Sequence, residues 1–177
     1  MRAWLPVPGT TTGRLVSAAL SQFGAHGFAG ASVADIARDA GVTTGALYHH
    51  FGSKAGLWVI VRADVEQRVL DRIEGAAAVV RVHSLAQLAP AILVGFDYLT
   101  RTDYARLLAE PAHPDGDVDA FEDDRLATVL DELLSGTGPA VGRYAAAAWR
   151  AALQQSTRGP SESDNARHGL ERLLTGR

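Results

Sequence analysis

The sequence predicts an all-α protein of about nine helices, in which an N-terminal three-helix module precedes a larger helical domain. Apolar residues recur at three- and four-residue spacing almost throughout the 177 residues, whereas the alternation expected of strands is nearly absent. The chain holds no cysteine, which excludes disulfides and cysteine-ligated zinc. Pro6 and Pro8 interrupt the first apolar residues, and no run of about 18 apolar residues follows, so we expect neither a signal peptide nor a membrane span.

The first two helices are predicted from an apolar stripe and from residues typical of helix ends. The first helix carries Phe23 on its stripe, and Gly27 marks its end. The second helix begins at Ser32, whose hydroxyl can cap it while Asp35 supplies the acidic partner three residues later. Gly41 ends this helix.

The next two helices differ in length. The third starts near Thr43 and stays short, because Gly52 follows Phe51 and stops it. Ser53 can cap the fourth helix, whose apolar residues at four-residue steps extend it beyond Ile73.

The second half of the chain repeats these signals with two proline interruptions. Ser84 can cap the fifth helix, but Pro90 lies inside the pattern and should kink the helix or delay its start. A loop rich in proline, glycine and aspartate precedes a helix predicted over 118–133. The eighth helix is predicted over 139–153, with its proline in the first turn, and the last from about Ser161.

The charge is divided unevenly along the chain. The net charge is −3, but residues 1–58 carry a net +2 and the remainder a net −5. A polyanionic partner therefore belongs to the N-terminal third.

The segment SVADIARDAGVTTGALYHHFGSK, from Ser32 to Lys54, carries the functional signal. It contains two short helices that meet across a turn of three or four residues at most. Ile36 and Leu47 supply a small apolar interface, while Ala37 lets the two backbones approach. Gly41 lies where the chain must reverse, a position that favours a left-handed conformation.

This arrangement leaves small and hydroxylic groups on an outward surface with few charges. Threonine can hydrogen-bond a base or a phosphate, and Ala46 can touch a thymine methyl group in the major groove. Ser32 and Lys54 lie at helix N-termini, where amides, a hydroxyl and an ammonium can hold phosphates. The predicted DNA-binding residues are Ser32, Thr43, Thr44, Gly45, Ala46, Tyr48, His49 and Lys54.

AALSQFGAHGF followed by SVADIARDAGVTTGALYHHFGSKAGL, within about Leu15 to Trp58, resembles the tetracycline-repressor (TetR) family of transcriptional regulators. The resemblance implies a flexible N-terminal segment over 1–10, a helix-turn-helix DNA-binding domain over 11–58, and an effector-binding and dimerisation domain over 59–177. It implies a homodimeric repressor that a small effector releases from operator DNA. Family members often carry a basic arm before the first helix, which PVPGTTTGR does not provide.

The same resemblance places an effector pocket and a dimer interface in the second domain. A small apolar or aromatic effector is expected, and no cofactor is required. The candidate effector-binding residues are Trp58, Phe96, Tyr104, Phe121 and Trp149. The candidate dimer-interface residues are Tyr144, Ala147, Ala148, Ala151, Leu170, Leu173 and Leu174.

Two other functions stay open. The weakly basic N-terminal part allows a ligand-binding dimer without DNA binding, and His83 or His113 allows a helical hydrolase, although no nucleophile motif supports it. His49 and His50 point about 100° apart on a helix, so they cannot chelate one metal ion together. We expect a cytoplasmic regulator that is not an enzyme and binds no metal.

Overall fold

In the computed structural model, the described residues, which are 7, 9–111, 124–136 and 140–176, form nine helices and no strand. The prediction of an all-α protein is confirmed. No helix in these ranges is long and apolar enough to cross a membrane. The helices are α1 (Thr11–Gly30), α2 (Val33–Asp39), α3 (Thr44–Phe51), α4 (Lys54–Ala77), α5 (Leu85–Arg101), α6 (Ala105–Ala109), α7 (Arg125–Leu133), α8 (Val141–Ser156) and α9 (Pro160–Thr175).

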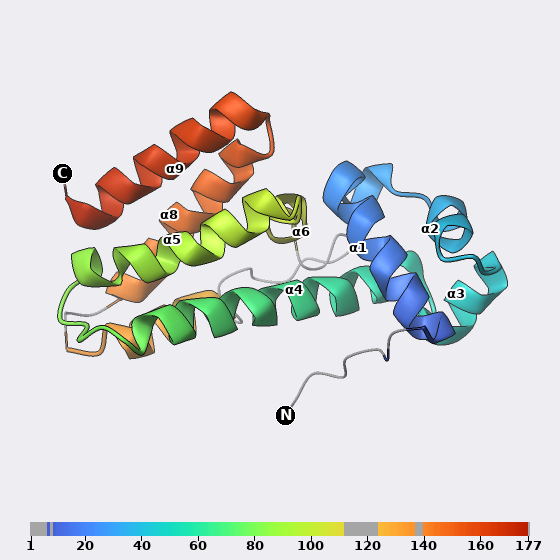
Figure 1. Cartoon of the computed structure of the whole chain (residues 1–177), viewed down its shortest axis with the longest axis horizontal. Helices are drawn as coiled ribbons and strands as arrows, with labels where there is room; N and C mark the ends of the chain where they lie inside the picture. Colours follow the sequence, from blue (N-terminus) through green and yellow to red (C-terminus); the bar gives the residue numbers. More distant parts are fainter. Residues whose placement is uncertain (1–6, 8, 112–123, 137–139, 177) are drawn as a thin grey trace.

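The long helix α4 connects the two parts of the molecule (Figure 1). Helices α1, α2 and α3 gather around its N-terminal end. Its remaining turns lie against α5, while α8 and α9 pack on α5 from the other side. Helix α4 therefore links α3 directly to the core of the second part.

Most helix ends fall where the sequence predicted them. The hydroxyls of Ser32, Thr43, Ser53 and Ser84 each accept a backbone N–H as N-caps. Gly52 ends α3 with a φ of +73°.

Three later boundaries differ from the predictions or cannot be compared with them. Pro90 does not delay α5, which begins at Leu85 with Ser84 as its cap. Helix α7 begins at Arg125, and the predicted start at 118 lies outside the described residues, as does Pro139. Helix α9 begins one residue before the predicted Ser161.

The two parts of the molecule contact each other where α1 is broken at Gly27. Gly27 lies inside α1 but has a φ of +69°, a left-handed value that suits glycine. A Cβ here would overlap the carboxylate of Glu110, which follows α6. Because the helix is broken, the N–H of Phe28 turns to Glu110 Oε2 at 2.8 Å. A carboxylate 82 positions away thus completes the backbone hydrogen bonding of α1.

Lys54, the first residue of α4, lies at the same broken turn. Its ammonium donates to the carbonyl oxygens of Phe28, at 2.8 Å, and Ala31, at 3.1 Å. It also lies 4.3 Å from the centroid of the Phe28 ring. A cation stabilises carbonyl groups at a helix end and the face of an aromatic ring, so Lys54 fastens α4 to the end of α1.

Two further side chains of α4 bind the end of α6. Arg62 is 9% exposed and donates to the carbonyl oxygens of Leu107 and Glu110. Burial lowers the pKa of Arg62 to about 10, which leaves the guanidinium charged at neutral pH. The Nε1–H of Trp58 donates to Pro111 O at 3.2 Å. The end of α6 is therefore bonded to α1 and α4 alike.

Helices α7 and α8 approach each other most closely at Gly142. A Cβ there would overlap the backbone of Leu130 and Asp131. The Asp131 carboxylate also accepts the N–H of Gly142 at 2.7 Å. Only a residue without a side chain allows this contact.

We expect Gly142→Ala to lower the free energy of unfolding by about 1–3 kcal/mol, because the added methyl meets backbone atoms that cannot move independently. Gly75→Ala is the matched control, since nothing lies near its Cβ position in α4. That control should raise the free energy of unfolding by about 0.5–1 kcal/mol. Urea unfolding measures both, and a neutral Gly142→Ala would contradict the close α7–α8 contact.

We expect Glu110→Ala to lower the free energy of unfolding by about 1–3 kcal/mol, because the N–H of Phe28 loses its acceptor. Glu110→Gln keeps an acceptor oxygen and should cost less. Amide exchange at Phe28 should accelerate in the alanine variant and change little in the glutamine variant. Glu74→Ala, at an exposed position of α4, is the control. Equal losses from the two alanine variants would contradict this role of Glu110.

Candidate nucleic-acid interface

The turn between α2 and α3 is closed by backbone hydrogen bonds. Gly41 has a φ of +64°, as its place in the turn predicted. Its N–H donates to Arg38 O, and the N–H of Val42 donates to Ala37 O, both at 2.9 Å. Ala37 is 2% exposed, which confirms that a small residue lies where the helices meet. The direction of α3 is thus fixed by local geometry.

The inner face of the helix pair is apolar. Ile36 and Leu47 are fully buried, and Phe51 is almost so. Leu47 and Phe51 therefore occupy core positions, as predicted. Because they anchor one side of α3, the opposite side must face outward.

The outer face of α3 carries most of the predicted DNA-binding residues. The side chain of Thr43 caps α3 by accepting the N–H of Ala46 at 3.2 Å. Tyr48 is 52% exposed and is the largest group on this face. The exposed residues are Thr43, Thr44, Gly45, Tyr48 and His49, and Ala46 is half-buried beside them.

Ser32 and Lys54 lie apart from this face, and both already have partners. The Ser32 hydroxyl accepts the N–H of Asp35 at 3.0 Å and donates to its carboxylate at 2.6 Å. Hydrogen bonds from Ser32 and then Arg38 lower the pKa of Asp35. The Lys54 ammonium, expected to be free for phosphate, binds the carbonyl groups at the broken turn of α1. The sequence pattern could not show this contact, because it depends on how α4 meets α1.

The charges beside α3 largely offset one another. Arg38 is exposed, but its guanidinium lies 2.5 Å from Asp35 and 3.2 Å from Asp39. A nucleic acid would therefore meet polar and small groups on α3 more than free cations.

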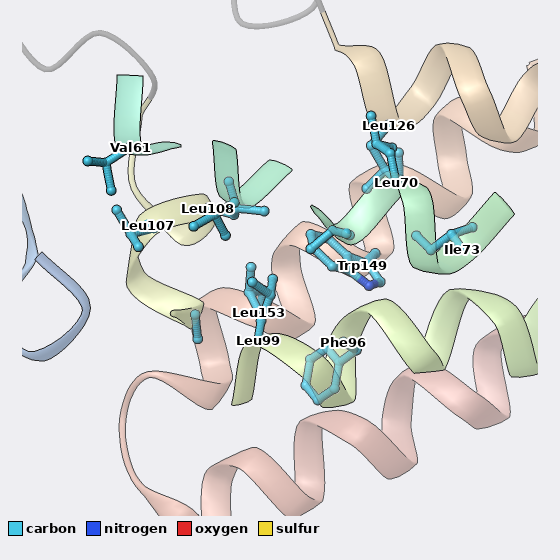
Figure 2. Close-up of a cluster of buried hydrophobic side chains, with 14 of the residues drawn as sticks. Val61, Leu70, Ile73, Phe96, Leu99, Leu107, Leu108, Leu126, Trp149 and Leu153 are labelled. Atoms are coloured by element: carbon cyan, nitrogen blue, oxygen red, sulfur yellow. The ribbon is translucent and has the colours of Figure 1, made fainter. Parts of the chain in front are cut away.

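The candidate effector-binding residues fall into separate places. Phe96 and Trp149 lie in one buried cluster between α4, α5 and α8 (Figure 2). Trp58 packs elsewhere, with its ring 5.0 Å from Phe23 in the core beneath α1. Tyr104 lies at the α5–α6 corner, 6.3 Å from the ring of Tyr98. Phe121 is outside the described residues.

Two surface hollows lie away from this cluster. One, of about 520 Å³, opens between α1, the α5–α6 corner and the α8–α9 corner, and Arg106 and Asp164 are among its polar lining residues. The other, of about 260 Å³, lies between α7 and α8 and is lined partly by Ala147, Ala151 and Arg150. Neither is lined by an aromatic side chain.

The candidate dimer residues divide between surface and core. Tyr144 is 73% exposed and Leu173 is 60% exposed, and Ala147 and Ala151 are exposed with Ala148 half-buried. Leu170 and Leu174 differ from the prediction, because both are at most 3% exposed within their own chain. They follow Ala166 at four-residue steps and so form the inner stripe of α9.

The residues considered for hydrolysis give no cluster in the described ranges. His83 is exposed, and its backbone N–H donates to Gln87 Oε1 at 2.7 Å. His113 lies outside those ranges. Within them, no three histidine, aspartate or glutamate side chains are grouped to hold a metal ion.

Comparison with known proteins identifies the N-terminal part. The family described as bacterial regulatory proteins, tetR family, matches residues 15–59. The HTH-type transcriptional regulatory protein RaaS of Mycobacterium tuberculosis (strain ATCC 25618 / H37Rv) is 50% identical over 48 residues. That match covers 27% of this chain and about a fifth (22%) of the length of the relative.

Solved structures share the fold over nearly the whole chain. A TetR-like transcriptional regulator from Rhodococcus sp. RHA1 has a TM-score of 0.67 at 21% identity, covering 97% of this chain and 96% of that one. The transcriptional regulator FadR from Bacillus subtilis, in complex with stearoyl-CoA, has a TM-score of 0.66 at 17% identity, covering 93% and 98%. The matched segment, residues 15–59, covers most of α1, all of α2 and α3 with the turn between them, and the first residues of α4. Residues 15–59 therefore match the tetR family of bacterial regulatory proteins, and the chain as a whole shares the fold of these solved regulators.

Proposed function

We propose that the protein is a homodimeric repressor that binds operator DNA through α3 and is released by a small effector. The observation that carries this proposal is the outer face of α3, which is exposed, rigidly anchored from beneath and composed of small and hydroxylic residues. A helix of this kind enters the major groove of B-DNA with its N-terminal residues against the base edges.

The first turn of α3 supplies the proposed base contacts. Thr44 can hydrogen-bond a base edge, and Ala46 can meet a thymine methyl group. Gly45 leaves room for the backbone to approach the groove. Tyr48 and His49 extend the same face toward the sugar-phosphate backbone.

Helix N-termini supply the proposed phosphate contacts. Thr43 lies at the cap of α3 and Ser32 at the cap of α2, where N–H groups and the helix dipole attract an anion. Lys54 uses two of its three donors at the broken turn, which leaves one for a phosphate. This contact is secondary to its role in holding α4.

The chain divides, in this proposal, into a DNA-binding domain over 11–58 and an effector-binding and dimerisation domain over 59–177. Helix α4 crosses the boundary without interruption. The regulatory domain can therefore change the placement of α3 only by moving α4 or the contacts around it.

The proposed dimer uses the outward faces of α8 and α9. Tyr144 and Leu173 are large apolar groups left exposed there, while Ala147 and Ala151 permit close helix packing. The hollow beside Ala147 and Ala151 gives a partner side chain a place to enter. Leu170 and Leu174 support this face from within rather than contacting the partner.

The proposed effector is small and apolar or aromatic, and its site includes Phe96 and Trp149. These two residues are the candidates that the fold brings together (Figure 2). The FadR protein, which shares the fold, was solved with stearoyl-CoA, a ligand with a long apolar chain. We place the protein in the cytoplasm, where operator DNA is accessible.

A gel-shift with the DNA upstream of the protein's own gene tests the function directly. Specific retardation that competitor DNA of random sequence does not remove is the expected result. A dimer that binds a ligand but retards no fragment would instead support the ligand-binding protein without DNA binding.

We expect Thr44→Val and Ala46→Ser to change which operator is chosen, because each base contact from the groove is worth about 1–3 kcal/mol of discrimination. Selection from a randomised DNA pool measures this preference. Thr128→Ala, at an exposed position of α7, is the control and should select the wild-type sequence. If both α3 variants also select the wild-type sequence, α3 does not read bases.

We expect Ala147→Glu and Leu173→Asp to yield monomers, because each would bury a charge at the proposed two-fold interface. Sedimentation velocity measures the oligomeric state. Val79→Asp is the control, since Val79 is 85% exposed at the far end of α4. Dimers that persist in both α8 and α9 variants would place the interface elsewhere.

A further inference from the structure

The core of the second domain contains a hydrogen-bond donor without an acceptor. Trp149 is 1% exposed, and its Nε1 finds no hydrogen-bond partner among the described residues. The other buried indole, that of Trp58, donates to Pro111 O. A buried indole N–H usually has a hydrogen-bond acceptor. Trp58 follows this rule, and Trp149 does not.

The surroundings of Trp149 explain why no acceptor is available. Figure 2 shows its ring within a cluster that includes Leu70 and Ile73 of α4, Phe96 of α5 and Leu126 of α7. All four side chains are hydrocarbon, and each is at most 3% exposed. These labelled neighbours therefore offer no acceptor to the N–H of Trp149.

Such a group is rare in native proteins, because burial removes the water that would otherwise accept the N–H. Phenylalanine would fill an apolar core without this cost. The indole in this position therefore calls for a partner that the described residues do not supply.

We infer that the effector is a neutral, mostly apolar molecule with one hydrogen-bond acceptor, and that this acceptor binds the Nε1–H of Trp149. The inference rests on the proposed effector site and adds the chemical class of its ligand. Aromatic ketones have this combination of an apolar body and a carbonyl oxygen.

The charge of the ligand follows from the same surroundings. A charged ligand in this hydrocarbon cluster would need a counter-charge. Arg62, the buried cation of α4, already donates to two carbonyl groups, and Glu66 and Asp124 act on its charge. A neutral acceptor satisfies the N–H without leaving an unpaired charge.

Neither of the two hollows described above is lined by Trp149, so a ligand that enters from either must rearrange the cluster. A ligand that reaches Nε1 takes the place of side chains from α4 or α5. Leu70 and Ile73 belong to α4, so the same event acts on the helix that carries the DNA-binding domain.

The experiment uses matched pairs of probes that differ by a carbonyl group: indane and 1-indanone, propylbenzene and propiophenone, 2-ethylnaphthalene and 2-acetylnaphthalene. The full-length protein, labelled with ¹⁵N, is titrated with each, and the indole N–H resonances are followed by NMR. Trp149→Phe assigns its resonance by absence. We expect at least one ketone to move the Trp149 resonance and to bind about three- to tenfold more tightly than its hydrocarbon partner, the ratio that one hydrogen bond provides.

Two variants separate a ligand contact from ordinary packing. In Trp149→Phe the ketone and the hydrocarbon should bind equally, whereas Trp58→Phe should keep the ketone preference because that indole already has an acceptor. If Trp149→Phe fails to fold, Trp4→Phe and Trp58→Phe assign the Trp149 resonance by elimination, and the wild-type titration still decides the matter. No displacement by any ketone up to its solubility limit, or an equal response to both members of every pair, would overturn the inference.

The operator gel-shift is run on the same samples. Operator binding that is intact while no ketone moves the Trp149 resonance overturns the ligand class and leaves the DNA-binding proposal standing. A Trp149 response to ketone with no change in operator affinity supports the site and contradicts release by an effector.

Discussion

The hydrogen bonding of the broken turn at Gly27 determines how the two parts of the molecule meet. The break exposes an N–H at Phe28 and the carbonyl groups that follow, and each buried polar group of the backbone needs a partner. Glu110 and Lys54 provide these partners from α6 and α4. Helix α4 and the end of α6 therefore meet at the broken end of α1, and none of the three helices can shift far without leaving a polar group unpaired. The DNA-binding part is oriented by this junction rather than by apolar contact alone.

The α2–α3 corner, in contrast, depends on residues that are close together in the sequence. Three residues within about three helical turns of sequence determine this corner. Gly41 has a left-handed φ, Ala37 lets the two helices approach closely, and Leu47 is the buried side chain that holds α3. These are properties of residue type and spacing, so the sequence was sufficient to predict the caps, the turn and the outward face of α3. The helix ends at Ser53 and Ser84 could be predicted for the same reason.

Contacts between distant segments could not be predicted in this way. Nothing in the spacing indicates that Glu110 meets Phe28, or that Lys54 turns toward α1 instead of toward a phosphate. An aromatic residue in a helical pattern also does not reveal which core it joins, which is why Trp58 was grouped with Phe96 although it packs beneath α1. In α9, Leu170, Leu173 and Leu174 are alike in type, and only packing on α5 and α8 decides that Leu173 faces outward. The grouping of the candidate effector residues therefore needed the structure, whereas the exposure of the outer face of α3 did not.

Helix α4 carries three of the contacts through which the two proposed sites can influence each other, and the Glu110–Phe28 hydrogen bond between the end of α6 and α1 is a fourth. Lys54 binds the broken turn of α1, Arg62 binds the end of α6, and Ile73 lies in the cluster around Trp149. At a rise of about 1.5 Å per residue, Lys54 and Ile73 are separated by about 28 Å along one continuous helix. A ligand that displaces Ile73 can reorient α4 only by straining the bonds of Arg62 and Lys54. In the proposed function those bonds oppose release from DNA, and their strength limits the coupling, which in such switches is about 1–3 kcal/mol. Since the coupling is reciprocal, bound DNA must weaken the ligand by the same factor.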